Sequence, residues 1–123
     1  MTGSSKWITK VRREAIYGRD NHCCQYCGLD VSNVPARERG LDHLEDLVNG
    51  GGHVGGNHAS TNLVTACMRC NSTRGAQSYV EFSSRFEGAL ARIEIQRATV
   101  VDTAAAKVRL ALDVPADREI IAA

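Results

Sequence analysis

The chain is poor in aromatic residues and lacks the long apolar segments of secreted and membrane proteins. It has 123 residues, 5% of them aromatic, which predicts one small domain with a modest core. Its first residues are polar, unlike the apolar region of a signal peptide. No apolar run approaches the roughly 20 residues that a bilayer-spanning helix needs. We therefore expect a soluble, cytoplasmic protein.

The net charge is also small. Its formal value is only +1, which says little about binding partners. The distribution of charge is more informative, since the basic residues outnumber the acidic ones near the start. Within residues 1–28 these are Lys6, Lys10, Arg12, Arg13 and Arg19, against Glu14 and Asp20. We expect a basic helix over residues 1–18, capped by Ser4 or Ser5. Clustered basic charge of this kind favours contact with nucleic acid.

The cysteines are present in a pattern that predicts a metal site. Two Cys-x-x-Cys pairs, Cys24–Cys27 and Cys67–Cys70, are separated by 39 residues. Four thiolates in two close pairs suit tetrahedral zinc, because each short turn places two sulfurs on one ion. The alternative is two disulfides, which a reducing compartment disfavours. Cys23 is the fifth cysteine; we expect a spectator thiol, although it is next to Cys24 and could replace it as a ligand.

Residues suited to hydrolytic chemistry lie between and just after these pairs. They are Asp42, His43, Asn62 and Asn71. Imidazole titrates near neutral pH, so His43 can act as a general base toward water. Asp42 offers a hard oxygen to a second, catalytic divalent cation. Neighbouring residues of a strand point to opposite faces, so the side chains of Asp42 and His43 can act on opposite sides of the strand.

The pattern of apolar and turn residues predicts two short strands, over residues 41–44 and 62–67, followed by a helix near residues 68–75. Residues 49–58 are rich in glycine and predict a loop. Ser78 begins a capping box that opens a helix. One face of that helix would carry Phe82, Phe86, Ala89, Leu90 and Ile93. A last amphipathic segment is expected to break at Pro115.

In order and spacing, these motifs resemble the HNH endonuclease family in its four-cysteine form. The resemblance runs from about Arg19 to Gly75. It implies an α+β fold with a small ββα-metal core, in which a structural zinc joins the two Cys-x-x-Cys knuckles. The expected organisation is an N-terminal basic helix (1–18), the nuclease core (19–77) and a C-terminal helical extension (78–123), in a single domain overall.

The resemblance also implies a role for each candidate residue. His43 would be the general base, and the Asn62 amide would pin the backbone that orients it. Asp42 and Asn71 would bind a catalytic divalent cation such as Mg²⁺ or Mn²⁺, while the four paired cysteines hold structural Zn²⁺. The expected substrate is double-stranded DNA, nicked or cut through both strands. Candidate DNA contacts are Arg74, Arg69, Arg19 and Arg12, and Arg69 could equally be plain surface charge.

Two departures from the family pattern leave questions open. Asp46, preceded by Glu45, stands where the pattern usually has proline. These acids could disfavour phosphate approach or recruit metal. The loop from Gly52 to Thr61 is a few residues longer than in the family pattern and carries His53 and His58, each of which could be a ligand, a substrate contact or simply solvated.

Other functions are compatible with part of the pattern. A non-catalytic zinc module that binds nucleic acid needs the cysteines and the basic helix, but not the Asp, His and Asn residues. A redox role fails because there is no thioredoxin-like βαβ pattern. Short members of the family occur in bacteriophages beside packaging genes, so phage packaging proteins are expected partners of a phage-encoded chain. The chain would be a monomer or homodimer.

Overall fold

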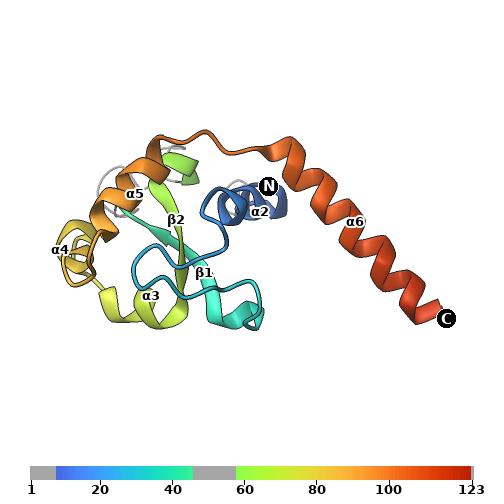
Figure 1. Ribbon diagram of the computed structural model, residues 1–123, viewed down its shortest axis with the longest axis horizontal. Helices are drawn as coiled ribbons and strands as arrows, with labels where there is room; N and C mark the ends of the chain where they lie inside the picture. Colours follow the sequence, from blue (N-terminus) through green and yellow to red (C-terminus); the bar gives the residue numbers. More distant parts are fainter. Residues whose placement is uncertain (1–7, 46–57, 123) are drawn as a thin grey trace, which may run out of the picture.

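A two-stranded antiparallel sheet lies at the centre of the molecule (Figure 1). The computed structural model describes residues 8–45 and 58–122, with only the backbone from residue 113 onward. Strand β1 (Arg39–His43) pairs with β2 (Leu63–Cys67), so that Asp42 lies opposite Val64. Every residue of β2 is buried. A sheet this small needs cover on both faces to be stable.

Helix α2 (Lys10–Arg19) covers one face of this sheet (Figure 1). It begins after Thr9, whose hydroxyl accepts a hydrogen bond from the backbone N–H of Arg12. The predicted caps, Ser4 and Ser5, lie outside the described residues. An apolar cluster fills the contact between helix and sheet and consists of Ile16, Tyr17, Leu41 and Leu63.

The opposite face is covered by α3 (Met68–Arg74), α4 (Tyr79–Ser83) and α5 (Ala89–Ala98). Their apolar side chains share one cluster with Val64 and Ala66 of β2. Tyr26 and Phe82 make an edge-to-face contact in it, with ring centroids 4.9 Å apart. Short 3₁₀ turns, η1 (Ala36–Glu38) and η3 (Ser60–Asn62), lead into the two strands.

The segment after Ser78 differs from the prediction. Ser78 does cap a helix, because its hydroxyl accepts the N–H of Glu81. The expected single helix is wrong, however, since it is divided into α4 and α5. Gly88 separates them with a φ of +76°, a left-handed conformation that glycine adopts without a steric penalty. The turn still directs both Phe82 and Ile93 into the core.

Helix α6 (Thr103–Ala122) packs its first turns on α2 and then extends away from the body (Figure 1). Ala106 is buried in this contact. The predicted break at Pro115 is wrong, because the helix continues through it. A proline removes one backbone hydrogen bond and can kink a helix, but the bonds on either side can hold the helix together. Among the described residues, no helix combines the length and apolarity needed to cross a membrane.

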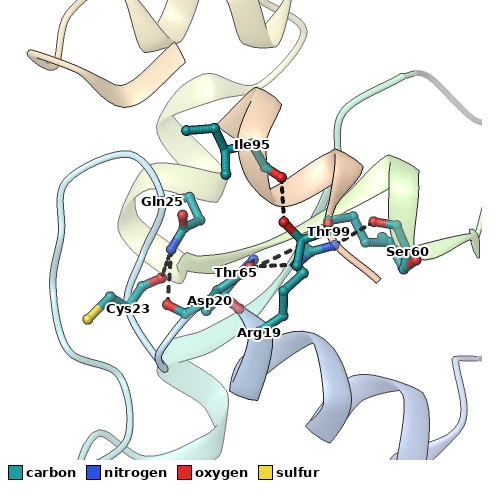
Figure 2. A network of polar contacts seen from close by, with 9 residues as sticks. Arg19, Asp20, Cys23, Gln25, Ser60, Thr65, Ile95 and Thr99 are labelled. Atoms are coloured by element: carbon teal, nitrogen blue, oxygen red, sulfur yellow. Dashed lines mark hydrogen bonds and ion pairs between the residues drawn. The ribbon is translucent and has the colours of Figure 1, made fainter. Parts of the chain in front are cut away.

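The outer edge of β2 is bound by residues 19–25 instead of a third strand (Figure 2). The N–H of Thr65 donates to Asp20 Oδ2 at 2.7 Å, and the N–H of Gln25 donates to the Thr65 carbonyl at 2.9 Å. Arg19 pairs with Asp20 and donates to the carbonyls of Ser60 and Leu63. These bonds attach the first cysteine turn to the sheet.

Candidate functional site

The four paired cysteines converge at one point of the fold. The Sγ atoms of Cys24, Cys27, Cys67 and Cys70 all lie within 4.8 Å of one another. The Cys27 and Cys67 sulfurs are 3.8 Å apart. A tetrahedral ion with Zn–S bonds of about 2.3 Å would hold its sulfurs roughly 3.8 Å apart. The donor set therefore fits a structural zinc.

Local structure positions each pair of sulfurs. Cys24 and Cys27 occupy a turn that Gly28 ends with a φ of +86°. Cys67 is the last residue of β2 and Cys70 lies in the first turn of α3, where its N–H donates to Cys67 Sγ at 3.5 Å. Zinc would therefore link the turn after α2 to the β2–α3 junction.

Cys23 lies outside this sulfur group. Its backbone forms an isolated bridge with Asp30. Burial, followed by the nearby Asp30 charge, raises the pKa of the Cys23 thiol. Cys24, not Cys23, is thus the cysteine placed for zinc.

His43 ends β1, and its half-buried imidazole contacts a second histidine. Its Nε2 lies 3.1 Å from Nδ1 of His58. Arg12 holds His58 in turn, by donating from Nη1 to the His58 carbonyl at 2.8 Å. The sequence left the role of His58 open, and the structure places it beside the candidate base.

The surroundings of His43 favour its neutral form. Burial is the main cause that lowers the pKa of His43, and the His58 charge is the next. Arg13 and Arg74 lower it further, while Asp42 opposes them. A neutral imidazole keeps a lone pair at neutral pH, as a general base requires.

Asn62 holds the chain just beyond His43. Its Oδ1 accepts the N–H of Glu45 at 2.8 Å, and its Nδ2 donates to the Glu45 carbonyl at 3.3 Å. The N–H of Leu44 also donates to the Asn62 carbonyl, at 2.9 Å. The Asn62 amide thus binds the backbone two residues after His43, where the sequence predicts a support for the base.

Asp42 points to the other face of the sheet, into a buried ion pair. Arg74 Nη1 donates to both carboxylate oxygens, at 2.7 and 2.9 Å, and the Tyr26 hydroxyl donates to Oδ2 at 2.5 Å. Arg74 also donates to the carbonyls of His43 and Leu44. Burial, together with the Asp42 charge, raises the pKa of Tyr26, so this hydroxyl stays a donor.

This environment does not fit the open carboxylate ligand that the sequence predicts for a catalytic cation. Asp42 is only 4% exposed, and both of its oxygens are engaged by a guanidinium that would repel a divalent ion. Asn71 lies on α3 close to Gly40 of β1, and its amide is half-buried.

The four arginines predicted for DNA contact lie in different environments. Arg74 is buried in the Asp42 pair, and the Arg19 side chain is 1% exposed in its pair with Asp20. Arg12 and Arg69 are exposed. Arg69 borders a cleft of about 460 Å³ beside Cys27 and Cys67.

The sequence also leaves open the roles of His53, Asp46 and Glu45. His53 and Asp46 lie outside the described residues. The exposed Glu45 carboxylate is 3.9 Å from Arg97. Sequence reasoning missed the Tyr26 contact to Asp42, because the two residues are distant in the chain and no local motif links them.

Comparison with known proteins agrees with this geometry. Residues 24–77 match the family model described as HNH endonuclease. That segment contains both cysteine pairs, the two strands and α3. No curated protein and no solved structure matches the chain. The matched segment has an α+β fold with a sheet of two strands, a following helix and four clustered cysteines. Residues 24–77 therefore resemble the HNH endonuclease family, and their four clustered cysteines are consistent with its four-cysteine ββα-metal form.

Proposed function

We propose that this chain is a metal-dependent endonuclease that hydrolyses phosphodiester bonds of double-stranded DNA, with His43 as general base. One observation carries the proposal: the half-buried imidazole of His43, in contact with His58, ends β1 within the segment that matches the HNH family model. Families with this fold are generally nucleases, so nucleic acid is the expected class of substrate.

In this mechanism His43 removes a proton from the water that attacks the phosphorus atom. The 3′ oxygen leaves, so the products are a 5′-phosphate and a 3′-hydroxyl. Asn62 and Arg74 hold the backbone at the base and just after it, through Glu45 and through the carbonyl of His43 itself. A fixed backbone keeps the imidazole within reach of its water.

A bound Mg²⁺ or Mn²⁺ would neutralise negative charge on the phosphate. Asn71 and Asp42 remain the proposed ligands on the basis of the family resemblance. Asp42 can serve only if its pair with Arg74 opens. Nicking and double-strand cleavage are both compatible with one such site per chain.

A second candidate function is a non-catalytic zinc module that binds nucleic acid. The buried pair of Asp42 and Arg74 favours it, because this pair occupies the carboxylate that a catalytic cation would need. Either function requires reduced cysteines, for which we propose a cytoplasmic location. Phage packaging proteins are proposed partners only of a phage-encoded chain.

Nicking of supercoiled plasmid by zinc-loaded protein separates the two functions. With added Mg²⁺ or Mn²⁺, His43→Ala should lower the rate by roughly 10²–10⁴-fold, the usual contribution of a positioned base. Zinc content and DNA affinity should stay near wild type. A chelator used at a concentration that leaves the thiolate-bound zinc in place should abolish plasmid nicking by the wild type.

His22→Asn is the matched control, since His22 pairs with Glu14 and has a φ of +56° that asparagine tolerates. It should nick at the wild-type rate. Equal nicking by wild type and His43→Ala, or none by either, would favour the binding module.

A further inference from the structure

A small basic groove lies between α2, the segment that leads into β1, and Leu110 of α6. Its volume is about 290 Å³, and its lining includes Lys10, Arg13 and Arg39, with Tyr17 at its side. The one acidic residue in the lining is Glu14. Three cations around a groove of this size favour an anionic ligand.

The positive charge of the groove is largely uncompensated. Glu14 is already paired, because Arg109 Nε lies 2.8 Å from its carboxylate. Arg39 is held in place by donating to the carbonyls of Val31 and Val34 and by lying 5.9 Å above the Tyr17 ring. In the part of the chain that the structure describes, the side chains of Lys10 and Arg13 make no hydrogen bond or ion pair.

The groove is next to the candidate base. Arg13 lies close enough to His43 for its charge to act on the imidazole. The neighbouring residue Arg12 donates to His58, which contacts His43. Lys10 and Arg13 are three residues apart on α2, so both lie on the same helix face. The first turns of α2 thus connect the groove with the site.

The cations predicted to bind the DNA backbone cannot all do so. Arg74 and Arg19 are buried in ion pairs, which leaves the substrate side of the site short of positive charge. Among the described residues, the flexible side chains of Lys10 and Arg13 have no ion-pair partner. The Arg39 guanidinium is held in a fixed position at the groove. Such a set contacts phosphates without reading bases.

We propose that this groove binds the DNA backbone beside the scissile phosphate, with Lys10 and Arg13 contacting phosphates along one strand. The inference rests on the proposed function, because it assigns a substrate surface to the same site. Binding there depends on charge and is independent of base sequence.

The test measures binding separately from cleavage. Zinc-loaded His43→Ala protein, with or without the double change Lys10→Gln and Arg13→Gln, is titrated onto a labelled duplex across a salt series. Each lost phosphate contact should lower the slope of log affinity against log salt by about 0.9, so the double variant should lose about 1.8. Affinity should fall alike for duplexes of unrelated sequence.

Two matched variants distinguish a phosphate contact in the groove from a general effect of lost charge. Lys107→Gln removes one exposed charge from α6, outside the groove, and should leave the slope near its starting value. Arg13→Lys keeps the charge and should retain most of the affinity that Arg13→Gln loses. Far-ultraviolet circular dichroism and zinc content verify that α2 and the metal site are intact.

The outcomes separate this inference from the proposed function. An unchanged slope in the double variant, or failure of the starting protein to bind DNA, overturns the inference. Loss of slope in the double variant, while protein with intact His43 fails to nick plasmid, supports the groove and rejects the nuclease. Loss of slope together with nicking by the protein with intact His43 supports both.

Discussion

At the scale of single residues, burial and the neighbouring His58 favour the neutral form of the candidate base His43. A His43 pKa below its ordinary value of 6.5 keeps the imidazole neutral into mildly acidic solution. As the pH falls, cleavage should therefore decline at a lower pH than the titration of an ordinary imidazole would give. The other charges acting on His43 are Asp42, Arg13 and Arg74.

Replacing His58 tests this balance. His58→Asn removes a group that lowers the pKa of His43, so the decline in rate should move to higher pH. The measurement is a pH–rate profile of plasmid nicking, with the His43 ring followed by NMR. His22→Asn should leave the profile in place. A decline that stays at the same pH in His58→Asn would contradict the assigned contact.

Arg74 should contribute to stability rather than to DNA binding. Removing one member of a buried ion pair leaves the other uncompensated, which costs about 3–5 kcal/mol. Arg74→Ala should lower the free energy of unfolding by that amount, measured by denaturant titration with zinc present. Arg69→Ala, on the exposed side of the same helix, should change it by less than about 0.5 kcal/mol. A lower salt slope of DNA binding without lost stability would restore Arg74 as a phosphate contact.

Several residue environments follow from the sequence, and others do not. The zinc cysteines are predictable because a Cys-x-x-Cys turn fixes two sulfurs locally, whatever the rest of the chain does. The burial of Arg74 is not, because it depends on Asp42, 32 residues away, and on Tyr26 beside both. The contact between His43 and His58 likewise joins residues 15 positions apart, which no local motif links.

At the scale of elements, the strands and the Ser78 cap were predictable, but the Thr9 cap of α2 and the division of the C-terminal helices were not. The strands β1 and β2 and helix α3 follow from short apolar runs and the cysteine turn. The stripe from Phe82 to Ile93 has helical spacing and still spans two helices. Gly88 turns the chain between them, and a single glycine inside a periodic pattern is compatible with either outcome.

Gly88→Ala and Gly18→Ala should have opposite effects on stability. At both positions an added Cβ meets no heavy atom within 4 Å, so backbone conformation decides. Gly88 has a φ of +76°, and a Cβ there should cost roughly 1–2 kcal/mol. Gly18 lies inside α2, where alanine should add roughly 0.5–1 kcal/mol. Denaturant midpoints of both variants check this, and equal midpoints would contradict the left-handed turn.

At the scale of the whole molecule, zinc should be part of folding itself. The ion would join the turn after α2 to the β2–α3 junction, and apparent binding energies of about 10–16 kcal/mol for structural zinc equal or exceed the stability of a small domain. Cys27→Ser should therefore lose the ion and cooperative unfolding, as measured by native mass spectrometry and thermal melting. Cys23→Ser should retain both. A cooperatively folded wild type without zinc would contradict this prediction.

The covered edge of β2 gives the metal a further consequence. Gln25 pairs with Thr65 from the middle of the first zinc turn, so this turn occupies backbone groups that would otherwise be open to another strand. Open strand edges recruit neighbouring chains and promote aggregation. Loss of the metal should therefore destabilise the fold and also expose the outer edge of β2 to other chains. After chelation, light scattering should rise with protein concentration. In this protein the zinc site would thus also prevent self-association through the edge of β2.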